Sequence, residues 1–120
     1  MLLFWVDESG EETEEENAAL IIALKSWLKE MTERGVRVSG NPLRSAREAK
    51  IVSVRDRELL VSDGPFAETK EQIGGYDVVE CPDMDTALQV AAAHPLARTA
   101  QVEVRPFWDA PWDHCPATVR

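Results

Sequence analysis

The order of the predicted elements indicates an α+β fold, in the ferredoxin-like, split β-α-β arrangement. A strand, a helix, a group of strands, a second helix and a final strand follow one another along 120 residues. Two helices most simply cover one face of a mainly antiparallel sheet. A chain of this length forms one domain and buries a core without disulfides or metals. We therefore predict one domain over residues 1–107 and an irregular tail over residues 108–120.

The hydrophobic pattern predicts the first strand and the first helix. Large apolar residues from Leu2 to Val6 are typical of a buried strand. Thr13 and Glu16 match a capping box, so we expect a helix over 14–34, and Gly35 suits its C-terminal cap. The apolar residues of this helix share one face: Leu20, Ile21, Leu24, Trp27, Leu28 and Met31.

Six further elements follow, each bounded by turn or capping residues. A hairpin turns at Asp56-Arg57, Asp83 suits the N-cap of the second helix, and Pro95 ends that helix near His94. The predicted elements are a strand over 36–39 that stops at 40–42, hairpin strands over 49–55 and 58–62, a strand over 76–81, a helix over 84–94, and an alternating strand over 100–106.

Composition excludes several classes of function. The net charge of −9 argues against nucleic-acid binding, which needs Lys and Arg for phosphate contacts. No apolar run is long enough to span a membrane, and the start reaches Asp7 too soon for a signal peptide, so we expect a cytoplasmic protein. Cys81 and Cys115 make no paired motif, His114 has no further ligands nearby, and no glycine-rich phosphate-binding pattern is present. We therefore predict neither a metal nor a cofactor.

The segment from Ser62 to Tyr76 is the most informative part of the chain. It combines the turn residues Asp-Gly-Pro at 63–65 with charged side chains, and it is longer than a simple reversal needs. The run DGPFAETKEQIGGY resembles the signature of the YCII-related family, in its DGPF-containing branch. The VEVRP run at 102–106 and the VSG run at 38–40 resemble the same family more weakly.

This resemblance implies a dimeric α/β barrel, in which two sheets pack face to face. The two helices leave a second sheet face whose apolar residues need cover, so the resemblance and the pattern both predict a homodimer. Trp108 and Trp112 are costly to leave in water, and we expect them to lie over the partner.

Asp63 and His94 are the candidate catalytic residues. Asp63 ends a predicted strand and can serve as a general base. A purely turn-forming role for this residue is an equally good interpretation. His94 shares the apolar side of the second helix and can act as its acid–base partner, or it can simply cap the last carbonyls.

Four other residues are candidate ligand-binding groups. Arg105 can hold a carboxylate or phenolate, or form an ion pair within the sheet. Phe66 is an apolar anchor for the loop, and Glu68 and Lys70 face a pocket or pair with each other.

Two functions fit these features. One is a small enzyme, of isomerase or lyase type, that uses acid–base chemistry on a small organic molecule. The other is a non-catalytic small-ligand or protein-binding module, which the resemblance links to sigma-factor signalling. Some relatives are thought to pair an Asp with a His on the first helix, but this helix contains no His. A closed polar pocket holding Asp63 favours the enzyme, and an open apolar patch favours the binding module.

Overall fold

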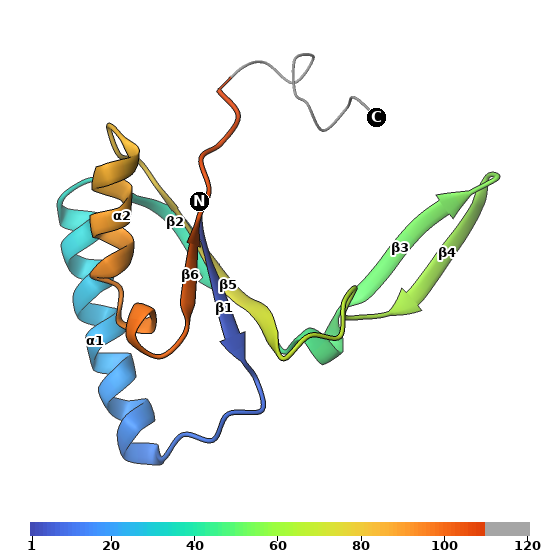
Figure 1. Ribbon diagram of the computed structural model, residues 1–120, viewed down its shortest axis with the longest axis horizontal. Helices are drawn as coiled ribbons and strands as arrows, with labels where there is room; N and C mark the ends of the chain where they lie inside the picture. The colour runs from blue at the N-terminus through green and yellow to red at the C-terminus, as the bar shows by residue number, and fades with distance from the viewer. Residues whose placement is uncertain (110–120) are drawn as a thin grey trace.

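The chain folds into a four-stranded antiparallel sheet covered on one face by two helices, with a separate hairpin (Figure 1). The computed structural model describes residues 1–109. Within the sheet the strand order is β2-β5-β1-β6, and neighbours run antiparallel. The elements are β1 (Leu2–Asp7), α1 (Glu14–Glu33), β2 (Arg37–Pro42), the 3-10 turn η1 (Ala46–Glu48), β3 (Lys50–Arg55), β4 (Glu58–Asp63), β5 (Glu71–Val79), α2 (Met84–Ala92), the 3-10 turn η2 (Pro95–Arg98) and β6 (Gln101–Val104).

The core lies between the helices and one face of this sheet. In Figure 1 both helices stand on the same side of the strands. Strand β1 contributes Leu2 and Phe4, whose side chains point to the helix side, while Leu3 and Trp5 alternate to the open side. The buried apolar residues are Leu2, Phe4, Trp27, Met31, Val90 and Ala91. The predicted α+β fold with both helices on one sheet face is confirmed.

Both ends of α1 are capped as the sequence predicts. The hydroxyl of Thr13 accepts a hydrogen bond from the Glu16 amide at 3.1 Å. At the other end, Gly35 has a φ of 69°, and the amide of Val36 donates to the Met31 carbonyl at 2.8 Å. This is the Schellman arrangement, which glycine favours because it has no Cβ.

The β3–β4 hairpin stands away from the rest of the molecule (Figure 1). Its strands pair only with each other among residues 1–109, and every residue of β4 is exposed. Asp56 and Arg57 both have positive φ, 50° and 66°, as a type I′ turn requires. The predicted hairpin and its turn are therefore confirmed.

The strands on either side of this hairpin are longer than predicted. Strand β2 continues through Gly40 to Pro42, and β5 begins at Glu71, so Gly74 and Gly75 lie inside a strand and not in a loop that turns. Glycine is needed at this point of β5 because β5 and β1 approach each other closely. Phe4 faces Gly75 while Trp5 faces Ile73, which leaves Gly74 as the extra residue of a β-bulge, and a Cβ there would lie 2.6 Å from Val6.

Some sequence expectations are not decided by the described residues. Trp112, His114 and Cys115 lie outside them, as does the tail from residue 110 onward. Trp108 is within them and is 53% exposed. Over residues 1–109 no helix is both long and apolar enough to cross a membrane.

Candidate functional site

A cavity of about 250 Å³ lies between α1 and the helix-facing side of the sheet. Most of its wall is apolar, and its polar side chains come from β2, β5 and the segment after α2. This size suits a small organic molecule and is below the usual range for drug-sized ligands. Its lining residues are Phe4, Val6, Leu24, Leu28, Arg37, Asn41, Pro42, Gly74, Gly75, Tyr76, Asp77, His94 and Leu96.

Asp77 is the buried carboxylate of this cavity. It faces Leu2 across the sheet and so points to the helix side, where it is 5% exposed. The Arg37 side chain donates to it, with Nε 2.8 Å from Oδ1, and also donates to the Gly40 carbonyl at 3.0 Å. A Cβ at Gly40 would lie 1.9 Å from Oδ1, so glycine makes room for the carboxylate. These contacts fix one oxygen of Asp77.

His94 lies against the other oxygen of the same carboxylate. Its Nε2 is 4.0 Å from Asp77 Oδ2, and its Nδ1 accepts a hydrogen bond from the Leu96 amide at 3.1 Å. With Nδ1 accepting, the neutral ring carries its proton on Nε2, toward Asp77. Phe4 and Trp27 hold the ring, with centroids 4.3 and 4.5 Å away. The imidazole therefore has a fixed orientation and a defined tautomer.

Burial sets the protonation of this pair. Desolvation raises the pKa of Asp77 above its ordinary value, although the hydrogen bond and charge of Arg37 act in the opposite direction. Desolvation also lowers the pKa of His94 to about 4, so the imidazole is neutral near pH 7. The site thus combines a carboxylate of increased basicity with a neutral hydrogen-bond donor.

The distance between these two groups leaves them free to bind a ligand. At 4.0 Å, Nε2 and Oδ2 are too far apart for a direct hydrogen bond. One ligand oxygen or C–H group placed between them from the cavity side can contact both. Such an arrangement can move a proton to or from the ligand while the imidazole holds the developing charge.

The two predicted catalytic residues lie in different parts of the structure. His94 lines the cavity, as described, and is 3% exposed. Asp63 ends β4 on the hairpin, where its exposed side chain pairs with Lys50 from β3, and it is absent from the residues lining the cavity. The Lys50 hydrogen bond lowers the pKa of the Asp63 carboxyl. Asp63 thus has the environment of a surface ion pair.

The predicted ligand-binding residues are spread over the surface. Arg105 pairs with Glu103, to which Trp5 also donates at 2.9 Å. Phe66 is 88% exposed. Glu68 and Lys70 line an open cavity of about 720 Å³ beside η1, where Lys70 Nζ lies 3.9 Å from Asp7 Oδ2. The loop after Asp63 therefore does border a concavity, at a place separate from His94.

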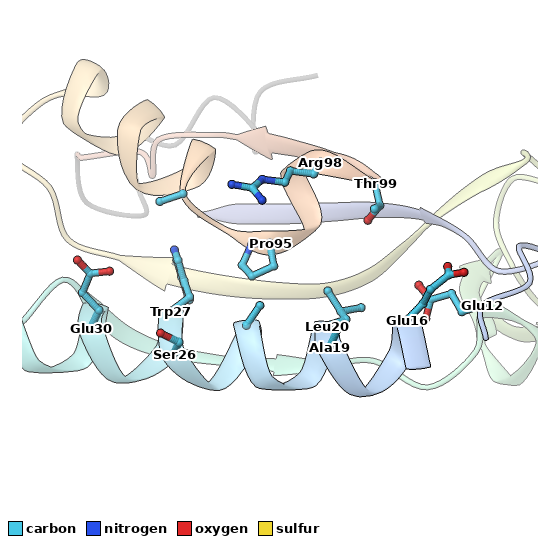
Figure 2. Close-up of a pocket in the computed structure, with 12 residues that line it drawn as sticks. Glu12, Glu16, Ala19, Leu20, Ser26, Trp27, Glu30, Pro95, Arg98 and Thr99 are labelled. Carbon is cyan, nitrogen blue, oxygen red and sulfur yellow. The ribbon is translucent and has the colours of Figure 1, made fainter. Parts of the chain in front are cut away.

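A further groove of about 530 Å³ runs between α1 and η2 (Figure 2). Trp27 and Pro95 form part of its wall, with Glu12 and Glu16 at one end and Glu30 at the other. Its carboxylates are exposed and it holds no buried titratable group, so it lacks the paired chemistry of the cavity at Asp77. Among residues 1–109, no group of three or more His, Cys, Asp or Glu side chains is arranged to hold a metal ion.

Sequence reasoning missed Arg37 and Asp77, which complete the site. The signal for Asp77 was available: it is a charged residue inside an apolar strand, between Tyr76 and Val78. Residues of this type are rarely buried unless paired. Arg37 likewise stands between Val36 and Val38 at the start of a strand, so an inward ion pair between the two strands was a possible interpretation.

A family model and one curated relative match this chain. The family model of the YCII-related domain matches residues 1–112. A protein of Rhizobium meliloti (strain 1021), described as uncharacterized, is 47% identical over 52 residues. That match covers 42% of this chain and 42% of the relative, so it spans less than half of the relative's length.

Proposed function

This chain belongs to the YCII-related family, and we propose that it is a small enzyme that moves a proton on a small organic molecule. The observation that carries the proposal is the buried pair of Asp77 and His94, whose Oδ2 and Nε2 atoms lie 4.0 Å apart at the wall of a cavity. Isomerisation and elimination are the reaction types that such a pair serves, since both begin with removal of a proton from carbon or oxygen.

In this proposal Asp77 is the general base. Its Oδ1 is held by Arg37, which leaves Oδ2 to accept the proton of the ligand. The raised pKa makes this carboxylate a stronger base than an exposed aspartate. His94 donates a hydrogen bond from Nε2–H to a ligand oxygen and stabilises the negative charge that develops there, a role that a preorganised neutral imidazole can fill.

The electrostatics of the cavity favour a neutral ligand. Arg37 and Asp77 neutralise each other, and His94 carries no charge near pH 7. An anionic ligand would lose its hydration without gaining an unpaired cation, at a cost of several kcal/mol. We therefore propose a compact, mainly apolar molecule with one carbonyl or hydroxyl group, such as a cyclic ketone or a phenol.

Asp63 remains the alternative base that the loop motif predicts. Its place in the DGPF segment supports assignment to the DGPF-containing branch, which we also propose. Its exposure and its pairing with Lys50 make it a weaker base than Asp77, because the positive charge stabilises the ionised form. The same experiment separates the two aspartates.

The test is exchange of carbon-bound hydrogen in D₂O, followed by proton NMR on a panel of cyclic and aryl ketones with acidic α-protons. The wild-type protein should accelerate exchange of at least one neutral member. Asp77→Asn should reduce the rate by about 10²–10⁴-fold, the usual contribution of a positioned base. His94→Gln should reduce it as well, and Asp63→Asn is the matched carboxylate control.

The outcomes distinguish the proposals. If Asp63→Asn abolishes exchange and Asp77→Asn leaves it unchanged, the base is Asp63 and our assignment is wrong. If the wild type binds panel members by NMR shift changes at His94 and yet exchanges none of them, the site is a binding site only. If no member binds or exchanges, the proposed ligand class is wrong.

One observation favours the second function, a binding module. The hairpin carries an open apolar patch, which is the feature expected of a protein-binding surface. A module of this kind would fit sigma-factor signalling, the role that the resemblance suggests.

We also propose that the protein is a homodimer, and that it is cytoplasmic. The homodimer is supported by the second face of the sheet, whose central strands carry half-buried apolar side chains: Leu3, Trp5, Ile73, Tyr76 and Val78.

A further inference from the structure

One face of the β3–β4 hairpin is entirely apolar over its central four residues. Val52 faces Val61 and Val54 faces Leu59, and directly opposed residues share a face. Their exposed fractions are 62% for Val52, 56% for Val61, 64% for Val54 and 66% for Leu59. The opposite face is mixed, since Leu60 faces Ser53 and Ile51 faces Ser62. We call these four apolar residues the arm patch.

A hairpin with this patch is not expected to be stable in water by itself. An isolated two-stranded sheet is marginal, and it needs a third strand or packing on an apolar face. Within residues 1–109 neither is present, because β3 and β4 pair only with each other and most of their side chains are exposed. The arm patch therefore indicates a surface that covers it.

The hairpin projects from the side of the sheet that the helices leave open. In Figure 1 the helices stand to the left of the strands, and the hairpin extends to the right. The molecule is consequently elongated, with extents of 50 × 37 × 19 Å. A body that packed on the open sheet face would occupy the angle between sheet and hairpin, next to the arm.

A second copy of the chain satisfies both surfaces at once. Four side chains bury far less than the roughly 800 Å² per partner that a stable interface needs, so the arm patch must be continuous with a larger surface. The open sheet face lies on the side toward which the hairpin extends (Figure 1), and its central strands carry the apolar Leu3, Trp5 and Val78 beside polar residues of the outer strands. A two-fold dimer contains two arm patches and two open sheet faces. Each arm patch then packs on the partner, and no arm patch is left exposed.

We propose that the β3–β4 hairpin is an arm that clasps a second copy of this chain, with the arm patch packed on the partner while the open sheet faces meet. The inference rests on the homodimer proposed above and adds the segment that holds the partner. It also predicts that the hairpin becomes ordered only in the dimer, since its stabilising contacts are intermolecular.

The direct test is NMR on a mixed dimer in which one copy carries ¹³C-labelled Val and Leu methyl groups and the other is unlabelled. Isotope-filtered spectra then report contacts between copies only. We expect cross-peaks from the methyl groups of Val54 and Leu59 to protons of the unlabelled copy. The methyl groups of Leu60, on the other face of the same strand, serve as the internal control and should give none.

Sedimentation of matched variants measures the energetic effect. Leu59→Ser removes one apolar side chain from the arm patch in each copy, and we expect the dimer Kd to rise by about 10-fold or more. Leu60→Ser changes the adjacent residue on the opposite face and should change the Kd by less than about threefold.

Each result decides between the proposals. A dimer without arm cross-peaks, in which Leu59→Ser and Leu60→Ser behave alike, would overturn the clasp and leave the homodimer standing. A wild-type monomer at about 100 μM would overturn both, because that is far above the Kd of a stable dimer. A tetramer that Leu59→Ser reduces to a dimer would show that the arm joins two dimers, which contradicts the clasp. The proton-exchange assay is independent of all three.

Discussion

Asp77, under the helices, and Asp63, on the hairpin, are both aspartates, but the first is buried and the second is exposed. Asp77 lies under α1, where it is 5% exposed and faces Arg37 and His94. Asp63 lies at the end of an exposed strand and faces only Lys50 among the described residues. Burial raises the pKa of the first carboxyl, while an ion pair and its hydrogen bond lower the pKa of the second.

This difference shows that the aspartate in a recognisable sequence motif need not be the aspartate in an environment suited to catalysis. The turn residues around Asp63 define a recognisable sequence, yet they hold the carboxylate at the surface, where the hydrogen bond and charge of Lys50 lower its pKa. Asp77 has no motif around it, but the fold removes it from water and supplies its partners. Perturbed carboxylates in cavities are the better candidates for proton transfer.

The largest expected difference between body and hairpin concerns side-chain truncation. Leu2 is fully buried, so Leu2→Ala should reduce the free energy of unfolding by about 2–5 kcal/mol at any protein concentration. Val52→Ala on the hairpin should act only where the protein is dimeric, because its proposed contacts are with the partner. Urea unfolding at two concentrations about 100-fold apart measures both. A concentration-independent loss for Val52→Ala would contradict the distinction.

The second difference is in the pH dependence of stability. Burial lowers the pKa of His94 to about 4, from an ordinary value of 6.5. Between these two values the imidazole is protonated in the unfolded chain and neutral in the folded chain. The free energy of unfolding therefore decreases as the pH falls from about 6.5 toward 4, by at most about 3 kcal/mol. His94→Gln lacks this term, so its unfolding free energy should fall less steeply over the same range. Parallel pH profiles would show that His94 titrates normally.

The smallest effects concern two positions with positive φ, one in each region. Gly35, at 69°, ends α1, so Gly35→Ala should cost about 1 kcal/mol of global stability. Arg57, at 66°, is strained in the hairpin turn, so Arg57→Gly should relieve strain there by about the same amount. Hydrogen exchange of hairpin amides should slow in Arg57→Gly while the amides of β1 are unaffected. Faster exchange in the hairpin would contradict this interpretation of the turn.

Local chemistry determined which parts of the fold were predictable. Thr13, Gly35 and Asp83 mark helix ends through contacts with their own neighbours, and Asp56-Arg57 marks a turn. The extents of β2 and β5 were underestimated, because Gly40 and Gly74 serve strand packing that involves distant residues. The pairing of Asp77 with Arg37 and His94 joins three separate elements, and no short segment encodes it. His94 was identified because the sequence places it on the apolar side of the second helix, although that helix ends at Ala92 and His94 instead caps the N-terminus of η2.

The central claim is that the fold makes Asp77 a carboxylate of raised basicity and leaves Asp63 a surface carboxylate of lowered basicity. An NMR titration of the carboxyl carbons, with aspartate labelled at Cγ, measures both groups in one experiment. The spectra of Asp77→Asn and Asp63→Asn assign the two resonances. We predict that Asp77 titrates above the ordinary value of 3.8 and Asp63 below it. If Asp77 titrates at or below the pKa of Asp63, the proposed base is wrong.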